Sequence, residues 1–292
     1  MLFRVLHFAL CSKVKSNNIQ EEAASMDLSL STKNVFSSAL RFAMSIDTLK
    51  NSPELAHELK TSAQEQVEFM LSEDDEVRLL VSREEVKSVV RLGISSVLST
   101  LLDRLSSLLL LPEEFDVLND IEWLCKVLPR MELMKDLVFK WADVSSEILV
   151  IAQNCKLGVK MKLVEVTGKV LEAVGYGVVI VPCGSRACLL KLWLPFIRRL
   201  KTLVDAEGSG SEYRMDEDLC EFLEGSMVSL VLTLPSNDQA EVFGEWMRGI
   251  ALEGVKFPDL SEAFEVWCYR SKSAKRRLLE KCDRLASENL AH

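Results

Sequence analysis

SREEVKSVVRLGISSVLSTLLDRLSSLLLLP, residues 82–112, is the most regular stretch of this 292-residue chain. Apolar side chains recur along it at spacings of three and four residues, which is the pattern of one face of an α-helix. The positions that share this face are Val86, Val90, Ile94, Val97, Leu101, Leu105 and Leu108. Ser82 and Glu85 form a capping-box pattern in front of them, and Pro112 stops the helix behind them. The stretch therefore predicts one long helix with a buried face.

The same helical spacing continues on both sides of this stretch, interrupted by residues that break helices. The breaks fall at Pro53, Pro129, Gly175, Pro235 and Pro258. Residues 178–181 are the one short β-branched run, and we interpret them as a link between helices because no partner strand is visible. No period of about 33–45 residues repeats cleanly. We therefore expect an all-α fold of about nine helices, packed as consecutive antiparallel hairpins in a helical array or an irregular bundle.

Polar and charged segments indicate how the chain is divided. Residues 1–30 carry no helical pattern and become polar and Ser-rich, so we expect a poorly ordered N-terminal segment. We expect residues 31–288 to form a single helical domain. Within it, the Gly-, Ser- and Glu-containing stretch at about residues 205–214 predicts a flexible loop. The acidic run at residues 73–76 predicts a solvated loop as well.

The charge balance argues against nucleic acid as a partner. The chain has 35 Lys and Arg against 44 Asp and Glu, a formal net charge of -9, and a phosphate backbone attracts such a protein poorly. One basic cluster interrupts this balance, formed by Arg270, Lys272, Lys275, Arg276, Arg277 and Lys281. We interpret it as the solvated face of the last helix. A nuclear-import signal and a nucleic-acid contact are the alternatives, and no aromatic platform supports the second of these.

No segment predicts export or membrane insertion. The apolar N-terminus, residues 1–10, is broken by Arg4 and His7 and lacks the long apolar core of a signal peptide. The longest apolar run, residues 97–111, contains two charged side chains and is shorter than the roughly 20 residues that span a bilayer. Eight cysteines are too sparse for a disulfide scaffold. We expect a protein of the cytoplasm or the nucleus with no membrane partner.

No constellation of residues predicts catalysis. The chain has three histidines, and His57 lies on an expected exposed helix face beside Glu54 and Glu58. The motifs of serine hydrolases, zinc proteases and nucleotide-binding folds do not occur in it. Cys183 and Cys188 are the closest cysteine pair, and neither a second pair nor a nearby histidine completes a zinc site. We expect no enzyme activity, no catalytic residue, no cofactor and no metal site.

Tryptophans and their neighbours in the second half of the chain carry a family resemblance. In order, these elements are Trp141-Ala142-Asp143, Trp193-Leu194-Pro195, Leu232-Thr233-Leu234-Pro235-Ser236-Asn237-Asp238-Gln239, Trp246, and Ala263-Phe264-Glu265-Val266-Trp267. Their order resembles the helical C-terminal region of plant BTB/POZ domain-containing proteins. The likeness is strong over about residues 185–270 and weaker over residues 116–184. The tryptophans occupy apolar helix positions, so we interpret them as core residues, and Ser236 with Gln239 forms a second capping-box pattern.

The resemblance implies a role in protein ubiquitination. Members of the family are understood to join a cullin-based ubiquitin ligase through their BTB domain, while the helical region selects the protein to be ubiquitinated. A BTB domain needs on the order of a hundred residues of mixed strand and helix. No strand pattern precedes the first expected helix, so we expect this chain to carry the helical region and to lack the BTB domain.

The resemblance therefore implies proteins as partners, with a cullin-based ligase complex among them. The alternative is a free-standing helical scaffold with no role in ubiquitination. Composition and spacing do not predict which residues bind a partner.

Overall fold

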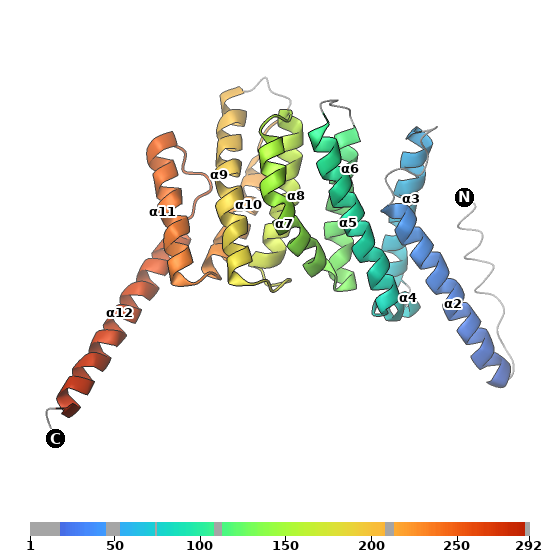
Figure 1. Ribbon diagram of the computed structural model, residues 1–292, viewed down its shortest axis with the longest axis horizontal. Coiled ribbons are helices and arrows are strands. Elements are labelled where there is room, and N and C mark those ends of the chain that lie inside the picture. Colours follow the sequence, from blue (N-terminus) through green and yellow to red (C-terminus); the bar gives the residue numbers. More distant parts are fainter. Residues whose placement is uncertain (1–17, 45–52, 74, 108–112, 208–212, 290–292) are drawn as a thin grey trace. The chain divides into compact units, whose positions relative to one another are not determined.

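The computed structural model describes residues 18–44, 53–73, 75–107, 113–207 and 213–289. These residues form eleven α-helices and one 3-10 helix and contain no strand (Figure 1). The helices are α2 (Asn18–Ala43), α3 (Pro53–Glu73), α4 (Asp75–Val81), α5 (Glu84–Ser106), α6 (Glu113–Val127), η1 (Leu128–Met131), α7 (Met134–Ala152), α8 (Leu157–Gly175), α9 (Cys183–Glu207), α10 (Glu217–Leu232), α11 (Ser236–Glu253) and α12 (Ser261–Asn289). The predicted all-α class is confirmed, with a helix count slightly above nine.

The N-terminal half holds helix that the sequence pattern did not indicate. α2 begins at Asn18, so residues 18–30, which the sequence predicts to be poorly ordered, are helical, while residues 1–17 lie outside the described residues. Glu, Gln, Ala and Met are strong helix formers even where no apolar face marks them, and they make up much of this segment.

Two expected loops are shorter in the structure than in the sequence-based prediction. Most of the acidic run at residues 73–76 is helical: Glu73 ends α3 and Asp75 begins α4, where carboxylates favour a helix N-terminus, while residue 74 lies outside the described residues. α4 follows because Val77, Leu80 and Val81 are buried. Similarly, α9 continues to Glu207, so the first residues of the loop expected at 205–214 are helical. Residues 208–212 of that loop lie outside the described residues.

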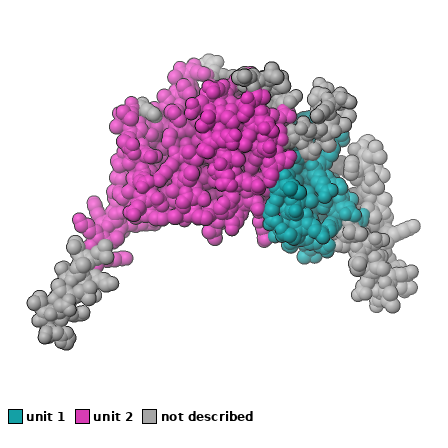
Figure 2. All heavy atoms as spheres, in the orientation of Figure 1, with its two compact units in different colours: residues 1–93 teal, residues 94–292 magenta. Residues whose placement is uncertain are grey.

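The chain divides into two compact units, residues 1–93 and residues 94–292, with the boundary inside α5 (Figure 2). The predicted face of α5 is confirmed, since Val86, Val90, Ile94, Val97, Leu101 and Leu105 are all buried and Leu108 lies outside the described residues. One helical domain over residues 31–288 stays a prediction.

The first unit is built on α2, α3 and α4, each of which packs against the other two. Its buried side chains include Phe36, Leu40, Val67 and Met70. On α2, Leu40 is buried while Val35 is 44% exposed, so the buried face of this helix does not include every apolar side chain.

The second unit arranges its helices in two layers. α6, α8, α10 and α12 contact one another in turn, and so do α7, α9 and α11. Helices adjacent in the chain also pack together, as in the pairs α7–α8, α8–α9 and α11–α12. This next-but-one stacking is the arrangement of a helical array, and it places α8 and α9 at the centre of the unit.

Among the described residues, no helix combines the length and the apolarity that crossing a membrane requires.

Candidate functional site

Trp141 and Trp193 form the core between α7 and α9. Both rings are fully buried and stack with centroids 6.0 Å apart and planes 16° from parallel. Ser145 connects them, because its hydroxyl donates to the Trp141 carbonyl at 2.6 Å and accepts from Trp193 Nε1 at 2.9 Å. These tryptophans are core residues, as the sequence predicted, and they align the two helices of one layer.

Trp246 and Trp267 fasten the last two helices. Trp246 is 4% exposed and its Nε1 donates to the Pro258 carbonyl at 2.7 Å, which holds the connection between α11 and α12. Trp267 packs against Phe243 and Phe264, with centroids 5.7 and 5.8 Å away. The Trp267 side chain is only partly buried. The predicted core position is therefore confirmed in full for Trp246 and in part for Trp267.

The capping box predicted at Ser236 and Gln239 does not form. Pro235 is the N-cap residue of α11, with no side-chain capping bond, and Ser236 is the first helical residue. Ser236 Oγ instead accepts from Trp267 Nε1 at 3.0 Å, and Gln239 Nε2 donates to the Val231 carbonyl at 2.8 Å. Both polar side chains therefore form hydrogen bonds with residues of α10 and α12 instead of capping α11.

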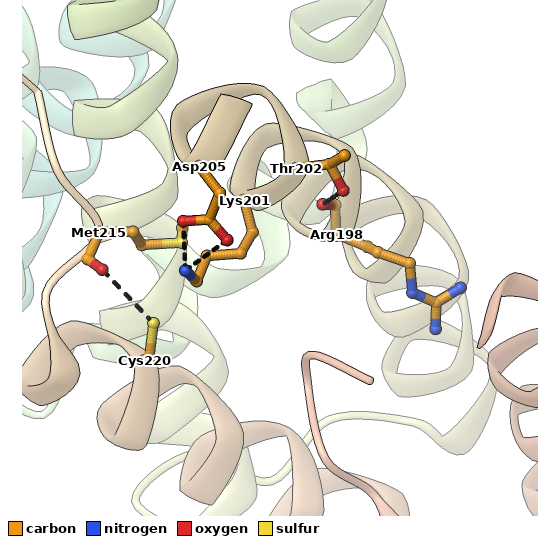
Figure 3. Close-up of polar contacts among 6 residues, drawn as sticks. All are labelled: Arg198, Lys201, Thr202, Asp205, Met215 and Cys220. Atoms are coloured by element: carbon orange, nitrogen blue, oxygen red, sulfur yellow. Dashed lines mark hydrogen bonds and ion pairs between the residues drawn. The ribbon is translucent and has the colours of Figure 1, made fainter. Parts of the chain in front are cut away.

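Arg198 is a structural residue that the sequence reasoning missed. It is 4% exposed on α9, where its Nε donates to the Phe257 carbonyl and its Nη2 to the Trp246 carbonyl, both at 3.3 Å. One turn later, the Thr202 hydroxyl donates to the Arg198 carbonyl at 3.1 Å (Figure 3). Gly249 leaves the space that the guanidinium fills. A signal was present, because an arginine follows two apolar residues on the buried side of α9.

The last turn of α9 and the start of α10 carry a second set of polar contacts (Figure 3). Lys201 Nζ lies 2.5 and 2.8 Å from the two carboxylate oxygens of Asp205, and this pair supports the end of α9. The Cys220 thiol donates to the Met215 carbonyl at 3.8 Å. Burial raises the pKa of the Cys220 thiol despite the nearby charge of Lys201, so the protonated thiol is favoured.

The cysteines and histidines give no metal centre in the described part of the chain, where no group of three potential ligands gathers. Cys183 and Cys188 are exposed and Cys125 is buried. Burial raises the pKa of the Cys125 thiol to about 12, which makes it a poor nucleophile. His57 is exposed on α3.

Among the described residues, the link between α8 and α9 carries three exposed apolar side chains in one short segment. Tyr176 and Val178 are each 61% exposed and Ile180 is 85% exposed. Val179 and Val181 anchor the link, since each is 4% exposed and the Val179 amide donates to the Ala173 carbonyl at 2.9 Å. The prediction of a link rather than a strand is confirmed. Alternating anchors hold three apolar side chains towards solvent.

A charged cluster joins α6 to α8. Lys162 Nζ lies 2.5 Å from one carboxylate oxygen of Glu122, and Lys169 Nζ lies 3.3 Å from the other. Lys162 also contacts Glu165 at 3.1 Å. Burial alone would raise the pKa of the Glu122 carboxyl, but the hydrogen bond and charge of Lys162 and the charge of Lys169 outweigh it and hold the pKa below its ordinary value of 4.5.

We expect Glu122→Gln to lower stability at neutral pH and to have no effect in acid. A carboxyl whose pKa is depressed on folding stabilises the protein above its unfolded pKa and loses that contribution as pH falls through the folded value. The loss at about pH 7 should be about 0.5–1 kcal/mol, because the pair is partly solvated. Thermal melts between about pH 7 and pH 3 should show the melting curves of the variant and the wild type converging. Glu147→Gln on the exposed face of α7 is the control, and a difference that stays constant with pH would contradict the prediction.

These features define an all-α protein. Its second unit is a two-layer helical array in which buried tryptophans and an arginine hold neighbouring helices together. A family model described as BTB/POZ Ankyrin-like repeat matches residues 110–274. The chain therefore belongs to that family, and the resemblance deduced from the tryptophan motifs is confirmed.

Two relatives from Arabidopsis thaliana, each a BTB/POZ domain-containing protein, give the extent of the likeness. One is 41% identical over 266 residues, which cover 84% of this chain and 58% of the relative. Another is 29% identical over 155 residues, which cover 52% of this chain and 27% of that protein. The chain thus spans little more than half the length of the first relative, and the likeness reaches further towards the N-terminus than the motifs indicated. No solved structure matches the chain.

Proposed function

We propose that this chain is the protein-selecting region of a substrate adaptor in a cullin-based ubiquitin ligase. Family membership supports the adaptor role, since the relatives are BTB/POZ domain-containing proteins. In this proposal the chain binds proteins rather than nucleic acid or a membrane, catalyses no reaction itself, and acts in the cytoplasm or the nucleus.

The observation that carries the proposal is the exposed apolar link of residues 176–180. It lies inside the family-matched segment, and three large side chains within five residues face solvent on a backbone that is anchored on both sides. Several exposed apolar side chains within one short segment are costly in water and are typical of protein-binding sites. Because the link is held in place before binding, little conformational entropy is lost when a protein docks on it.

Ile180→Asp tests this assignment directly. We expect the variant to keep the wild-type melting temperature, because the side chain is 85% exposed, and to recover at least about tenfold less ubiquitinated protein when immunoprecipitated from plant cells. Any cullin recovered should be equal in amount with the wild type and with the variant, because the family joins its ligase through the BTB domain and not through this link. Val150→Asp is the matched control, since Val150 is also 66% exposed but lies on α7.

Two results would contradict the proposal. Equal recovery of ubiquitinated protein with Ile180→Asp and Val150→Asp would remove the link from substrate selection. Cullin recovered with the wild-type chain would support direct membership of the ligase, whereas a wild-type chain without cullin would confine it to partner binding.

The two-layer array supports one alternative, a free-standing helical scaffold with no role in ubiquitination. Stacked helices present extended surfaces to partners without any further machinery. Partner recovery that depends on Ile180, together with an absence of cullin and of ubiquitin conjugates, would favour this alternative.

A further inference from the structure

The solvent-facing side of α12 carries a row of exposed side chains, here called the outer stripe. Its members are Glu262, Glu265, Tyr269, Lys272 and Arg276. They follow one another at spacings of three, four, three and four residues, which keeps them on one face of the helix. Tyr269 is 75% exposed. The other side of the helix packs into the unit through Ala263, which is fully buried, and through Phe264 and Trp267.

Charge is distributed with opposite sign on the two sides of Tyr269. Glu262 lies seven residues before it and Arg276 lies seven residues after it. Glu265 lies four residues before it and Lys272 three residues after it. With a rise of about 1.5 Å per residue, the charges of the outer pair stand about 10 Å to either side of the tyrosine.

We propose that α12 pairs with α12 of a second copy of this chain, antiparallel, about a two-fold axis at Tyr269. This arrangement brings Glu262 of each copy opposite Arg276 of the other and Glu265 close to Lys272, and it places the two Tyr269 rings side by side. An isologous interface needs a surface that is its own complement, and the outer stripe meets that condition.

Other occupants fit the outer stripe less well. A parallel pair would set Glu262 against Glu262 and Arg276 against Arg276, which is repulsive. A membrane of anionic lipid or a nucleic acid would attract Lys272 and Arg276 but repel both glutamates and the net charge of -9. The self-complementary order of charges therefore favours a second copy.

All of these side chains are exposed, so the dimer should be weak and sensitive to salt. Exposed ion pairs each contribute little to binding, so the dimer should form only at high protein concentration.

A charge-swap experiment on the full chain tests the arrangement. Sedimentation velocity should show a concentration-dependent dimer for the wild type. The variant E262K/E265K and the variant K272E/R276E should each be monomeric, with dissociation constants raised at least about tenfold, because each would set like charges against each other. Mixing the two variants should restore a dimer, since all contacts between them are then attractive. The combined variant E262K/E265K/K272E/R276E should dimerise by itself.

The control variant R270E/K275E changes the net charge of α12 as much as K272E/R276E does, but at positions outside the outer stripe. It should dimerise like the wild type, and circular dichroism should show that every variant keeps its helix content. A wild-type chain that stays monomeric, or a mixture of the two charge variants that does not dimerise, would overturn the proposal. Binding of the wild type to anionic vesicles without self-association would overturn it in favour of a lipid surface.

Discussion

Trp193→Ala should lower the free energy of unfolding by about 3–5 kcal/mol, the range for removing a large aromatic side chain from a core. The Trp193 ring is fully buried on α9, stacks on Trp141 of α7 and meets the edge of Phe196 at a centroid distance of 5.7 Å. The substitution also removes the donor to Ser145 Oγ. Alanine would leave a cavity that two packed helices cannot close without moving apart, and urea unfolding followed by circular dichroism measures the loss.

Two further variants separate the parts of this effect. Trp193→Phe keeps most of the ring but loses the bond to Ser145, and should cost about 1–2 kcal/mol. Trp267→Ala should also cost less than Trp193→Ala, about 1–2 kcal/mol, because the Trp267 ring is partly exposed and less of its surface leaves water on folding. A Trp193→Ala variant that unfolds at the wild-type urea concentration would show that the ring is not a core element.

Gly249→Ala should destabilise the protein by about 2–4 kcal/mol through overpacking and lost hydrogen bonds. A Cβ atom at this position on α11 would lie 1.4 Å from Arg198 Nη1 and 2.4 Å from Arg198 Cζ. The guanidinium can yield only by giving up its bonds to the carbonyls of Trp246 and Phe257, which hold the connection into α12. Adding one methyl group at residue 249 should therefore weaken the contact between α9 and the connection from α11 to α12.

A double-mutant cycle makes this explanation testable. In an Arg198→Ala background the clash is gone, so Gly249→Ala should be neutral or should stabilise the helix by up to about 1 kcal/mol. Urea midpoints of the four chains give the coupling between the two positions. If the effects of the two substitutions simply add, Gly249 is not required for the seating of Arg198.

Helix positions and most of the core could be predicted because they depend on local spacing. The face of α5 that begins at Val86 is buried as expected, and Trp193 and Trp246 lie in the core. A three- or four-residue period puts side chains on one face whatever the partner helix is. The link after Gly175 was recognisable for a similar reason, since four β-branched residues without a second strand cannot build a sheet.

Polar side chains were predicted less well, because their partners are far away in the chain. Ser236 and Gln239 form a capping-box pattern, yet they bond to Trp267 and to Val231. Arg198 donates hydrogen bonds to the carbonyls of Trp246 and Phe257, which lie 48 and 59 residues further along the chain. The sequence around Arg198 does not indicate these distant acceptors. The start of α2 at Asn18 was missed for another reason, since a helix of good helix formers needs no apolar stripe to form.

By itself the sequence determined the helical class, the order of most helices and the apolar faces that pack, because these follow from backbone propensity and the spacing of neighbouring residues. The tertiary structure alone decided the two-layer stacking of next-but-one helices, the seating of Arg198 against Gly249 and the exposure of Ile180 on its anchored link. Each of these depends on which surfaces meet after the helices have formed. The burial of an arginine or the exposure of an isoleucine depends on atoms many residues away, and local spacing does not identify those partners.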